Sequence, residues 1–319
     1  MINRFNRKEL IYTVYMEGSI SKAAQKLFIS QPSLSVMIQK IEEEIGTPLF
    51  DRTSKPIRLT EAGLEYVKAT EEILHIEKAF DNYLNAVNGL ECGSLKLGSN
   101  QLMSSLVLPK YISAFINRYP KIDLQLVDHN SAVLEEMITS GQLDLIVDNQ
   151  KMDPQIFEQR FLRSERLLLA VPKSFSCNSG LEEYRMEEAQ ILSGDHLTGK
   201  TLPVPLQPFQ NVPFISMTRH NDTRHRSDDI FHEAGIKPRT ILEIDRLVTL
   251  YSFVEMGTAA SVVSDTLVRH IRHHCKDVWF YCLGSERAQR EIYVTYKRNK
   301  YYSKSMEAFI DIVSDFIEA

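Results

Sequence analysis

Apolar residues recur at helical spacing along the first ninety residues of the chain, and this pattern predicts a succession of helices. The first two apolar stripes consist of Ala23, Ala24 and Leu27, followed by Leu34, Ile38, Ile41 and Ile45. Ser30 stands just before the second stripe, where its hydroxyl is suited to cap a helix, and Pro32 falls in the first turn, where its missing N–H costs nothing. Gly46 and Pro48 end that helix. The spacing alone is compatible with a DNA-binding helix-turn-helix or with an ordinary hairpin of two helices.

The residues that follow the second helix favour the DNA-binding alternative. Leu49 and Phe50 are an apolar pair suited to a three-helix core, and residues 51–60 have the pattern of a short two-stranded wing. In this region the chain resembles the LysR-type transcriptional regulators. The matching residues are Ala23, Ala24, Leu27, Ser30, Gln31, Pro32, Ser35, Ile38, Glu42, Gly46, Pro48, Leu49, Phe50, Arg52, Leu59, Thr60, Glu61, Ala62 and Gly63. The resemblance implies an N-terminal, all-α winged helix-turn-helix domain over residues 1–60.

The second helix is the expected DNA-reading element, because in a helix-turn-helix it lies in the major groove and its first residues face the bases. The predicted DNA-contacting residues are Ser30, Gln31, Pro32, Ser33, Ser35, Gln39 and Lys40, with Arg52, Lys55 and Arg58 on the wing. LysR-type relatives commonly carry arginine directly after the serine that matches Ser35, whereas this chain has Val36 followed by Met37. Val36 is unable to hydrogen-bond a base edge but is suited to touch a thymine methyl group. Base recognition is therefore expected to fall to the glutamines and serines, and phosphate contacts to Lys40 and the wing.

A third apolar pattern follows, in which the spacing alternates between four and three residues. Its members are Ala62, Tyr66, Ala69, Ile73, Ile76, Phe80, Tyr83, Val87 and Leu90. A repeat of this kind is typical of a coiled-coil seam, and Thr60 is placed to cap the helix. The alternative is an amphipathic helix that packs only on its own domain. After a DNA-binding head, the repeat favours a linker helix over residues 61–91 that joins two chains into a homodimer and presents two recognition helices to a palindromic site.

The distribution of charge agrees with a DNA-binding N-terminal domain, because residues 1–60 are basic and the rest of the chain is acidic. Residues 1–60 contain nine Lys and Arg against six Asp and Glu, a balance of +3, which leaves −8 for the rest of a chain whose net charge is −5. The four scattered cysteines predict no disulfide framework. We find neither the apolar run of a signal peptide nor an apolar stretch of the roughly 18 residues that a membrane span needs. These features predict a cytoplasmic protein without a membrane partner.

From Gly93 onward strands alternate with helices, which predicts a parallel sheet with helices on both faces. The predicted strands are 94–98, 123–127, 143–147, 214–217 and 240–244, and the predicted helices are 102–117 and 131–139. This part resembles the effector domain of LysR-type regulators at Pro109, Phe115, Tyr119, Pro120, Gly141, Leu143 and Asp144. The resemblance implies an α/β, periplasmic-binding-protein-like effector domain over residues 92–319. Subdomain I is placed at 92–163 and 268–319, and subdomain II at 164–267, with crossovers near Arg163 and Leu267.

Polar residues follow several of the predicted strands. In such α/β folds, ligands bind at the carboxyl ends of the strands, in the crevice between subdomains. The candidate effector-binding residues are Ser99, Asn100, Gln101, Met103, Asp128, Asn130, Asn221, Thr223, Arg224 and Arg246. Helix starts beside hydroxyl and guanidinium groups suit a small-molecule effector with a carboxylate or another anionic group. The alternative for each polar residue is ordinary helix capping without any ligand.

Histidines and cysteines in the predicted effector domain raise an alternative function, the sensing of a metal ion or of redox state. His270, His273, His274, Cys275 and Cys282 are candidates for a metal or redox sensor, although their spacing matches no standard site. No glycine-rich phosphate loop, nucleophile motif or metal triad predicts an enzyme, and no cofactor is expected. The missing export signal argues against a stand-alone binding protein. The sequence therefore predicts a ligand-responsive regulator of the LysR type. The resemblance implies dimers that pair again into homotetramers and contacts with RNA polymerase if the protein activates transcription.

Overall fold

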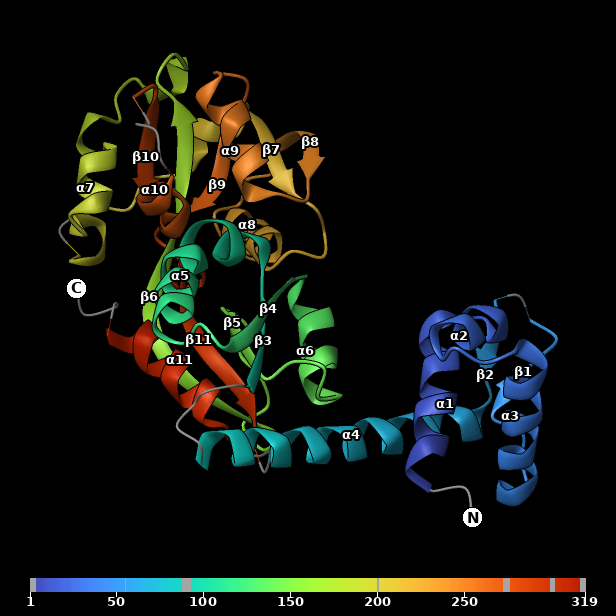
Figure 1. Ribbon diagram of the computed structural model, residues 1–319. Coiled ribbons are helices and arrows are strands. Elements are labelled where there is room, and N and C mark those ends of the chain that lie inside the picture. Colours follow the sequence, from blue (N-terminus) through green and yellow to red (C-terminus); the bar gives the residue numbers. More distant parts are fainter. Residues whose placement is uncertain are drawn as a thin grey trace. The chain divides into compact units, whose positions relative to one another are not determined.

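The chain folds into two compact units, residues 1–84 and 85–319, and we describe each by itself (Figure 1). The structure is a computed structural model that describes residues 4–54, 56–87, 93–199, 201–271, 276–298 and 302–315. The first unit holds α1 (Arg4–Glu17), α2 (Ile20–Lys26), α3 (Gln31–Ile45), β1 (Phe50–Asp51), β2 (Arg58–Leu59) and most of α4 (Glu61–Val87). The predicted order of helix-turn-helix, wing and long helix is confirmed.

The core of the first unit is formed by the apolar stripes of the sequence. Ala23 and Ala24 of α2 are buried, and so are Leu34, Ile38 and Ile41 of α3. Leu49 and Phe50 close this core as expected, with exposed fractions of 0% and 3%. Ile45, the fourth predicted member of the stripe, is instead 43% exposed. It lines a cavity of about 500 Å³ beside α4 rather than the core.

The starts of α3 and α4 are each fixed by a hydroxyl cap. Ser30 accepts a hydrogen bond from the backbone N–H of Ser33, and Gly46 ends α3 in the left-handed conformation with φ of 83°. Thr60 accepts from the backbone N–H of Gly63 at 3.0 Å and donates to the carbonyl oxygen of Pro48 at 2.7 Å. These two bonds attach the first turn of α4 to the wing.

Gly63 allows α4 to approach the segment between α3 and β1 closely. A Cβ at this position would lie 1.9 Å from the carbonyl oxygen of Leu49. We expect Gly63→Ala to destabilise the first unit by about 3 kcal/mol, because backbone must move to relieve the overlap. Gly46→Ala is the matched control: nothing lies within 4 Å, and the positive φ costs only about 1 kcal/mol. Helix loss measured by circular dichroism checks this, while the fluorescence of Trp279, the single tryptophan of the chain, follows the second unit. Equal loss in both variants would contradict the close approach.

The second unit is an α/β domain built from nine strands and seven α-helices within the described residues. Its strands are β3 (Gly93–Ser99), β4 (Ile122–Asp128), β5 (Leu145–Asp148), β6 (Phe157–Pro172), β7 (Pro213–Met217), β8 (Arg239–Ile244), β9 (Ser261–Ser264), β10 (Val278–Cys282) and β11 (Gln289–Lys297). Its helices are α5 (Leu108–Arg118), α6 (Ser131–Thr139), α7 (Glu188–Leu192), α8 (Asp222–Glu233), α9 (Leu247–Glu255), α10 (Asp265–His270) and α11 (Lys304–Asp315). A π-helical turn, Met103–Val107, precedes α5 in the predicted helix 102–117.

Two sheets share the long strand β6. Its first part pairs with β11, and the sheet continues through β5 and β3 to β4. Its last part, from Leu167 to Pro172, pairs with β9 and β10. The predicted parallel pairing is confirmed for β3 with β4 and β5, and for β7 with β8. The strands β6, β9, β10 and β11 pair antiparallel, which the sequence did not predict.

Helices cover both faces of each sheet, and the alternation of side chains along the strands shows why. In β5, Leu145 and Val147 pack into the cluster that contains residues of α5 and α11, whereas Ile146 packs with Leu134 and Ile138 of α6. Figure 1 shows α6 on the side of β3 and β5 that is opposite to α5 and α11. In β6, Leu168 and Leu169 are likewise divided between two clusters.

The return crossover between the two sheets differs from the one predicted at Leu267. Leu267 lies in α10, and the following strand β10 still pairs with β6 through Val278 and Pro172. Only β11 rejoins the first sheet, beginning at Gln289. The crossover therefore falls between β10 and β11, because a strand's sheet is decided by its partner and not by its place in the sequence. The outgoing crossover is within β6, where Arg166 is the last residue paired with β11.

Candidate DNA-binding and effector-binding sites

The first residues of α3 form an exposed polar surface. Gln31, Pro32, Ser33, Gln39 and Lys40 are exposed, and Ser35 is half-buried. The Gln31 amide donates to Ser35 Oγ at 2.8 Å, and the Gln39 amide donates to Glu43 at 3.1 Å. Polar side chains at the N-terminal end of an exposed helix suit contacts with base edges and phosphates. The two apolar positions, Val36 and Met37, are 53% and 37% exposed on the same helix.

Glu42 joins this helix to the wing. Its Oε1 accepts from the backbone N–H groups of Leu49 and Phe50 at 2.8 and 3.1 Å, and its Oε2 accepts from Arg52 at 2.6 Å. Arg52, predicted to contact phosphate, therefore already has an acidic partner. Arg58 lies exposed on β2, and Lys55 lies outside the described residues. The wing thus has a fixed position relative to α3.

A small cavity of about 90 Å³ lies at the carboxyl ends of β3 and β7. Six of the predicted effector-binding residues line it: Asn100, Gln101, Met103, Asn130, Asn221 and Thr223. A second cavity of about 720 Å³ shares Ser131, Asn149, His220, Asp222 and Arg290 with it. The two cavities bring together residues that follow β3 and β5 and residues that follow β7 and β8, which form a two-stranded sheet of their own, as expected for a crevice between subdomains.

The other four predicted residues lie elsewhere. Ser99 is fully buried and donates to the carbonyl oxygen of Val147 at 2.7 Å, so its hydroxyl faces the sheet. Asp128 and Arg246 are exposed and line neither cavity. Arg224 points to another surface, where it pairs with Asp228 at 2.7 Å and Glu243 at 2.9 Å. The helical turn separates Arg224 from Thr223, because successive side chains of a helix point about 100° apart.

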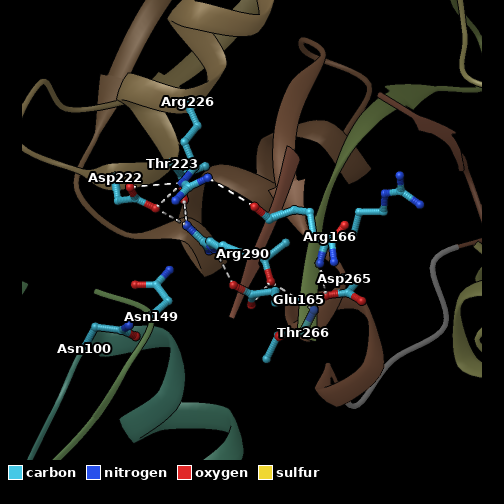
Figure 2. A network of polar contacts seen from close by, with 12 residues as sticks. Asn100, Asn149, Glu165, Arg166, Asp222, Thr223, Arg226, Asp265, Thr266 and Arg290 are labelled. Carbon is cyan, nitrogen blue, oxygen red and sulfur yellow. Dashed lines mark hydrogen bonds and ion pairs between the residues drawn. The ribbon is translucent and has the colours of Figure 1, made fainter. Parts of the chain in front are cut away.

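Arg290 is the central charged group of the crevice, and the sequence did not indicate it. It lies on β11 and is 7% exposed. Figure 2 shows its guanidinium between Glu165 on one side and Asp222 and Thr223 on the other. It donates through Nη1 to Asp222 at 2.8 Å and to Thr223 Oγ1 at 3.1 Å, and through Nε to Glu165. With its amide oriented by this network, Asn149 accepts from the same guanidinium at 2.8 Å.

The pKa values of two buried acids behind the cavities are shifted in opposite directions. Burial raises the pKa of Asp148, against the opposing effect of the hydrogen bonds from Ser131, Asn149 and Asn100. Burial alone would also raise the pKa of Glu165, but Arg290 and the hydroxyls of Ser264 and Thr266 outweigh it and lower that pKa. The Glu165 carboxylate is therefore a built-in anionic partner of Arg290. Asp148 ends the otherwise apolar strand β5 and Asn149 follows it directly, so the strand-end rule, applied to β5, would have found them.

The histidine and cysteine candidates are not gathered into a metal site in the part of the chain that the structure describes, which holds no group of three or more potential ligands. His270 contacts the carbonyl oxygen of Thr266 through Nδ1, and burial lowers its pKa. Cys282 is 3% exposed, and burial raises the pKa of its thiol, which makes it less reactive. His273, His274 and Cys275 lie outside the described residues. We also find no helix among the described residues that is both long and apolar enough to cross a membrane.

Two family models match the chain. The model described as "Bacterial regulatory helix-turn-helix protein, lysR family" matches residues 5–64, and the "LysR substrate binding domain" matches residues 88–317. A probable RuBisCO transcriptional regulator of Cyanidioschyzon merolae is 26% identical over 316 residues, which cover 94% of each chain. The uncharacterized HTH-type transcriptional regulator YcgK of Bacillus subtilis is 28% identical over 298 residues, covering 92% of this chain and 89% of the relative.

Solved structures share the fold over almost the whole chain. Full-length CbnR in complex with its target DNA has a TM-score of 0.62 at 22% identity, covering 97% of this chain and 98% of that one. A full-length OxyR variant from Pseudomonas aeruginosa has a TM-score of 0.69 at 18% identity, covering 100% and 95%. At these identities the likeness concerns the fold alone.

Proposed function

This chain belongs to the LysR family of transcriptional regulators, and from that membership we propose that it binds a palindromic promoter site as a dimer or tetramer and responds to a small molecule in the crevice of the second unit. The observation that carries the DNA-binding part is the exposed polar start of α3, held beside a wing by Glu42. Residues 1–60, 61–91 and 92–319 would serve DNA binding, dimerisation and effector binding. The action is regulatory, without catalysis, in the cytoplasm where the promoter DNA is found.

Regulation in this proposal follows from the crevice. An effector that binds one arrangement of the two subdomains better than another shifts the population toward it. Such a shift would change how the two heads of a dimer meet the DNA, and with it the bending of the DNA and any contact with RNA polymerase. Metal or redox sensing is not favoured, because Cys282 is buried and the described residues hold no group of three or more potential metal ligands.

The test is selection of an operator from a random double-stranded library with the full-length protein, followed by footprinting. We expect a palindrome whose half-sites lie about 10 base pairs apart or a multiple of that, because each recognition helix enters the major groove on one face of the DNA. Affinity should fall steeply with salt, as phosphate contacts require. Enrichment of no sequence, or of a site without two-fold symmetry, would contradict the proposal.

Val36 gives this recognition helix a property of its own. We expect Val36→Arg to raise affinity for DNA of any sequence and to steepen the salt dependence by about one unit of slope, because it adds one phosphate contact. Preference should weaken at one base pair of the half-site, where Val36 touches a thymine methyl. Deoxyuridine in place of that thymine removes the methyl group, so it should weaken wild-type binding and leave Val36→Arg unaffected. If Val36→Arg keeps both the wild-type base preference in the half-site and the wild-type affinity for DNA, this role of Val36 is contradicted.

A further inference from the structure

The crevice carries its own counter-ions at the point where an anionic ligand would be expected. Arg290 is its most deeply placed cation, and its guanidinium already donates to two carboxylates, Glu165 and Asp222. Arg226, the next cation, donates to Asp222 at 2.9 Å and to the carbonyl oxygens of Arg287 and Gln289 at 2.9 and 3.2 Å. Both arginines of the crevice are therefore engaged by the protein itself.

Asp222 occupies the favoured position for an anion at the start of α8. It is the first residue of the helix, where the backbone dipole favours negative charge, and it follows the cap Asn221, which accepts from the backbone N–H of Thr223 at 2.9 Å. Its carboxylate accepts from Arg226 and Arg290 together. Figure 2 shows Asp222 pointing toward Arg290 from the start of α8, the helix that connects β7 to β8. The carboxylate thus bridges the two subdomains as an anionic ligand would.

The charges around the cavities leave no excess of cations. In the larger cavity three cationic side chains face three acids: Lys151, Arg226 and Arg290 against Asp222, Glu286 and Glu291. In the smaller cavity Arg290 faces both Asp222 and Asp245. The other polar groups of the smaller cavity are mainly amides and an imidazole, among them Gln101, Asn130 and His220. These groups exchange hydrogen bonds with hydroxyl, amide or amine groups and offer no charge to a carboxylate.

We propose that Asp222 is an internal counter-ion that fills the anion position of the crevice, so that the effector of this regulator is an uncharged or cationic polar molecule and not a carboxylate or phosphate. The assignment rests on the proposed function in one respect, that the effector binds in this crevice. It replaces the anionic effector expected from the sequence. Burying a third anion beside Glu165 and Asp222 is unfavourable, because like charges at short range repel and the ligand would displace the water that solvates them.

The test uses Asp222→Asn in the full-length protein, with sulfate as the probe at constant ionic strength. Asp228→Asn is the matched control, since it removes the same charge from the same helix but faces Arg224 outside both cavities. We expect sulfate to raise the thermal midpoint of Asp222→Asn saturably, by about 3–6 °C at roughly ten times its Kd. Wild type and Asp228→Asn should show no saturable rise. If Asp222→Asn folds poorly, Asp222→Ser takes its place, because serine also suits a helix start. We expect the same saturable rise of the thermal midpoint with sulfate for Asp222→Ser.

Two outcomes overturn the assignment: saturable sulfate binding by wild type, or none by either Asp222 variant. Binding of the selected operator, measured by gel shift on the same proteins, separates this test from the proposed function. If operator binding is intact but the expected difference in sulfate binding is not found, only the assignment of Asp222 as an internal counter-ion is contradicted. If wild type binds no operator, the proposed function is contradicted.

Discussion

Replacing Arg290 with methionine is expected to destabilise the second unit by about 3–5 kcal/mol, the range for breaking a buried ion pair by removing one partner. Methionine replaces the unbranched aliphatic part of the arginine side chain, so the apolar packing along it is kept. Glu165, which is fully buried, would be left with its hydroxyl partners and no cation. Urea unfolding followed by Trp279 fluorescence measures this unit selectively, because Trp279 lies on β10.

The dependence of this loss on pH identifies its cause. In wild type Arg290 helps to lower the pKa of Glu165, so the pair stabilises the fold above the ordinary pKa of 4.5, and this contribution disappears as the pH falls below it. In the variant burial raises that pKa, so the folded protein holds a proton on Glu165 that the unfolded chain releases above its ordinary pKa of 4.5, and the stability of the variant falls as the pH rises. Between pH 7 and pH 5 the difference between variant and wild type should therefore shrink by up to about 2.7 kcal/mol, the change for one bound proton over two pH units.

Arg287→Met is the control for the loss of an arginine. Arg287 lies three residues earlier and pairs with Asp229 and Glu233, but its side chain is 53% exposed. Exposed ion pairs contribute little, so the urea midpoint should stay close to that of wild type. A similar loss in both variants, or a loss for Arg290→Met that does not change with pH, would show that packing and not the buried charge governs the effect.

The head of this protein was predictable because its signals are local. Ser30, Gly46 and Thr60 fix the ends of helices through partners within a few residues or across one turn, and the apolar stripes lie within single helices. The prediction that Ile45 is buried was wrong, because α3 extends beyond the three-helix core and its last turn lines the cavity beside α4. Periodicity identifies a face of a helix but not how far along the helix that face stays covered.

The body was predictable where strands and helices alternate, and not where distant strands pair. The parallel strands β3, β4 and β5 follow the alternating pattern, but β6 and β11 find each other across more than a hundred residues. For the same reason the crossover was misplaced at Leu267. Strand-end polarity gave six of the ten predicted crevice residues and would have given Asn149. The same rule does not predict Arg290, because Arg290 lies inside a strand and is placed beside Glu165 only by antiparallel pairing.

The apolar stripe of α4 is the feature of the head that its own core leaves uncovered. Ile73, Ile76 and Phe80 are 43%, 68% and 60% exposed. The head packs against another side of the helix, through Val67 and Thr70, which are 2% and 3% exposed, and through the ion pair of Lys8 with Glu77 at 2.6 Å. An exposed stripe with coiled-coil spacing on a helix whose other side is occupied is suited to a second copy of the same helix.

We therefore expect Ile76→Glu and Phe80→Glu, singly or together, to convert the protein to monomers in light scattering. The glutamates introduced into the two chains would meet across the two-fold axis in an apolar seam, where charge is costly to bury. Affinity for the full palindrome should fall by about 100-fold or more, because the second half-site is no longer bound by a linked head. Binding to an isolated half-site should not change, since both side chains lie outside the core of the head.

Lys68→Glu is the matched control, because it introduces the same residue on the same helix at an exposed position off the stripe. It should remain dimeric and bind the palindrome about as wild type does. If Ile76→Glu and Phe80→Glu also remain dimeric, the seam is wrong and the second unit must join the chains. If they become monomeric yet bind the palindrome with undiminished affinity, each head reads its half-site independently, and the linked-head account of operator binding fails.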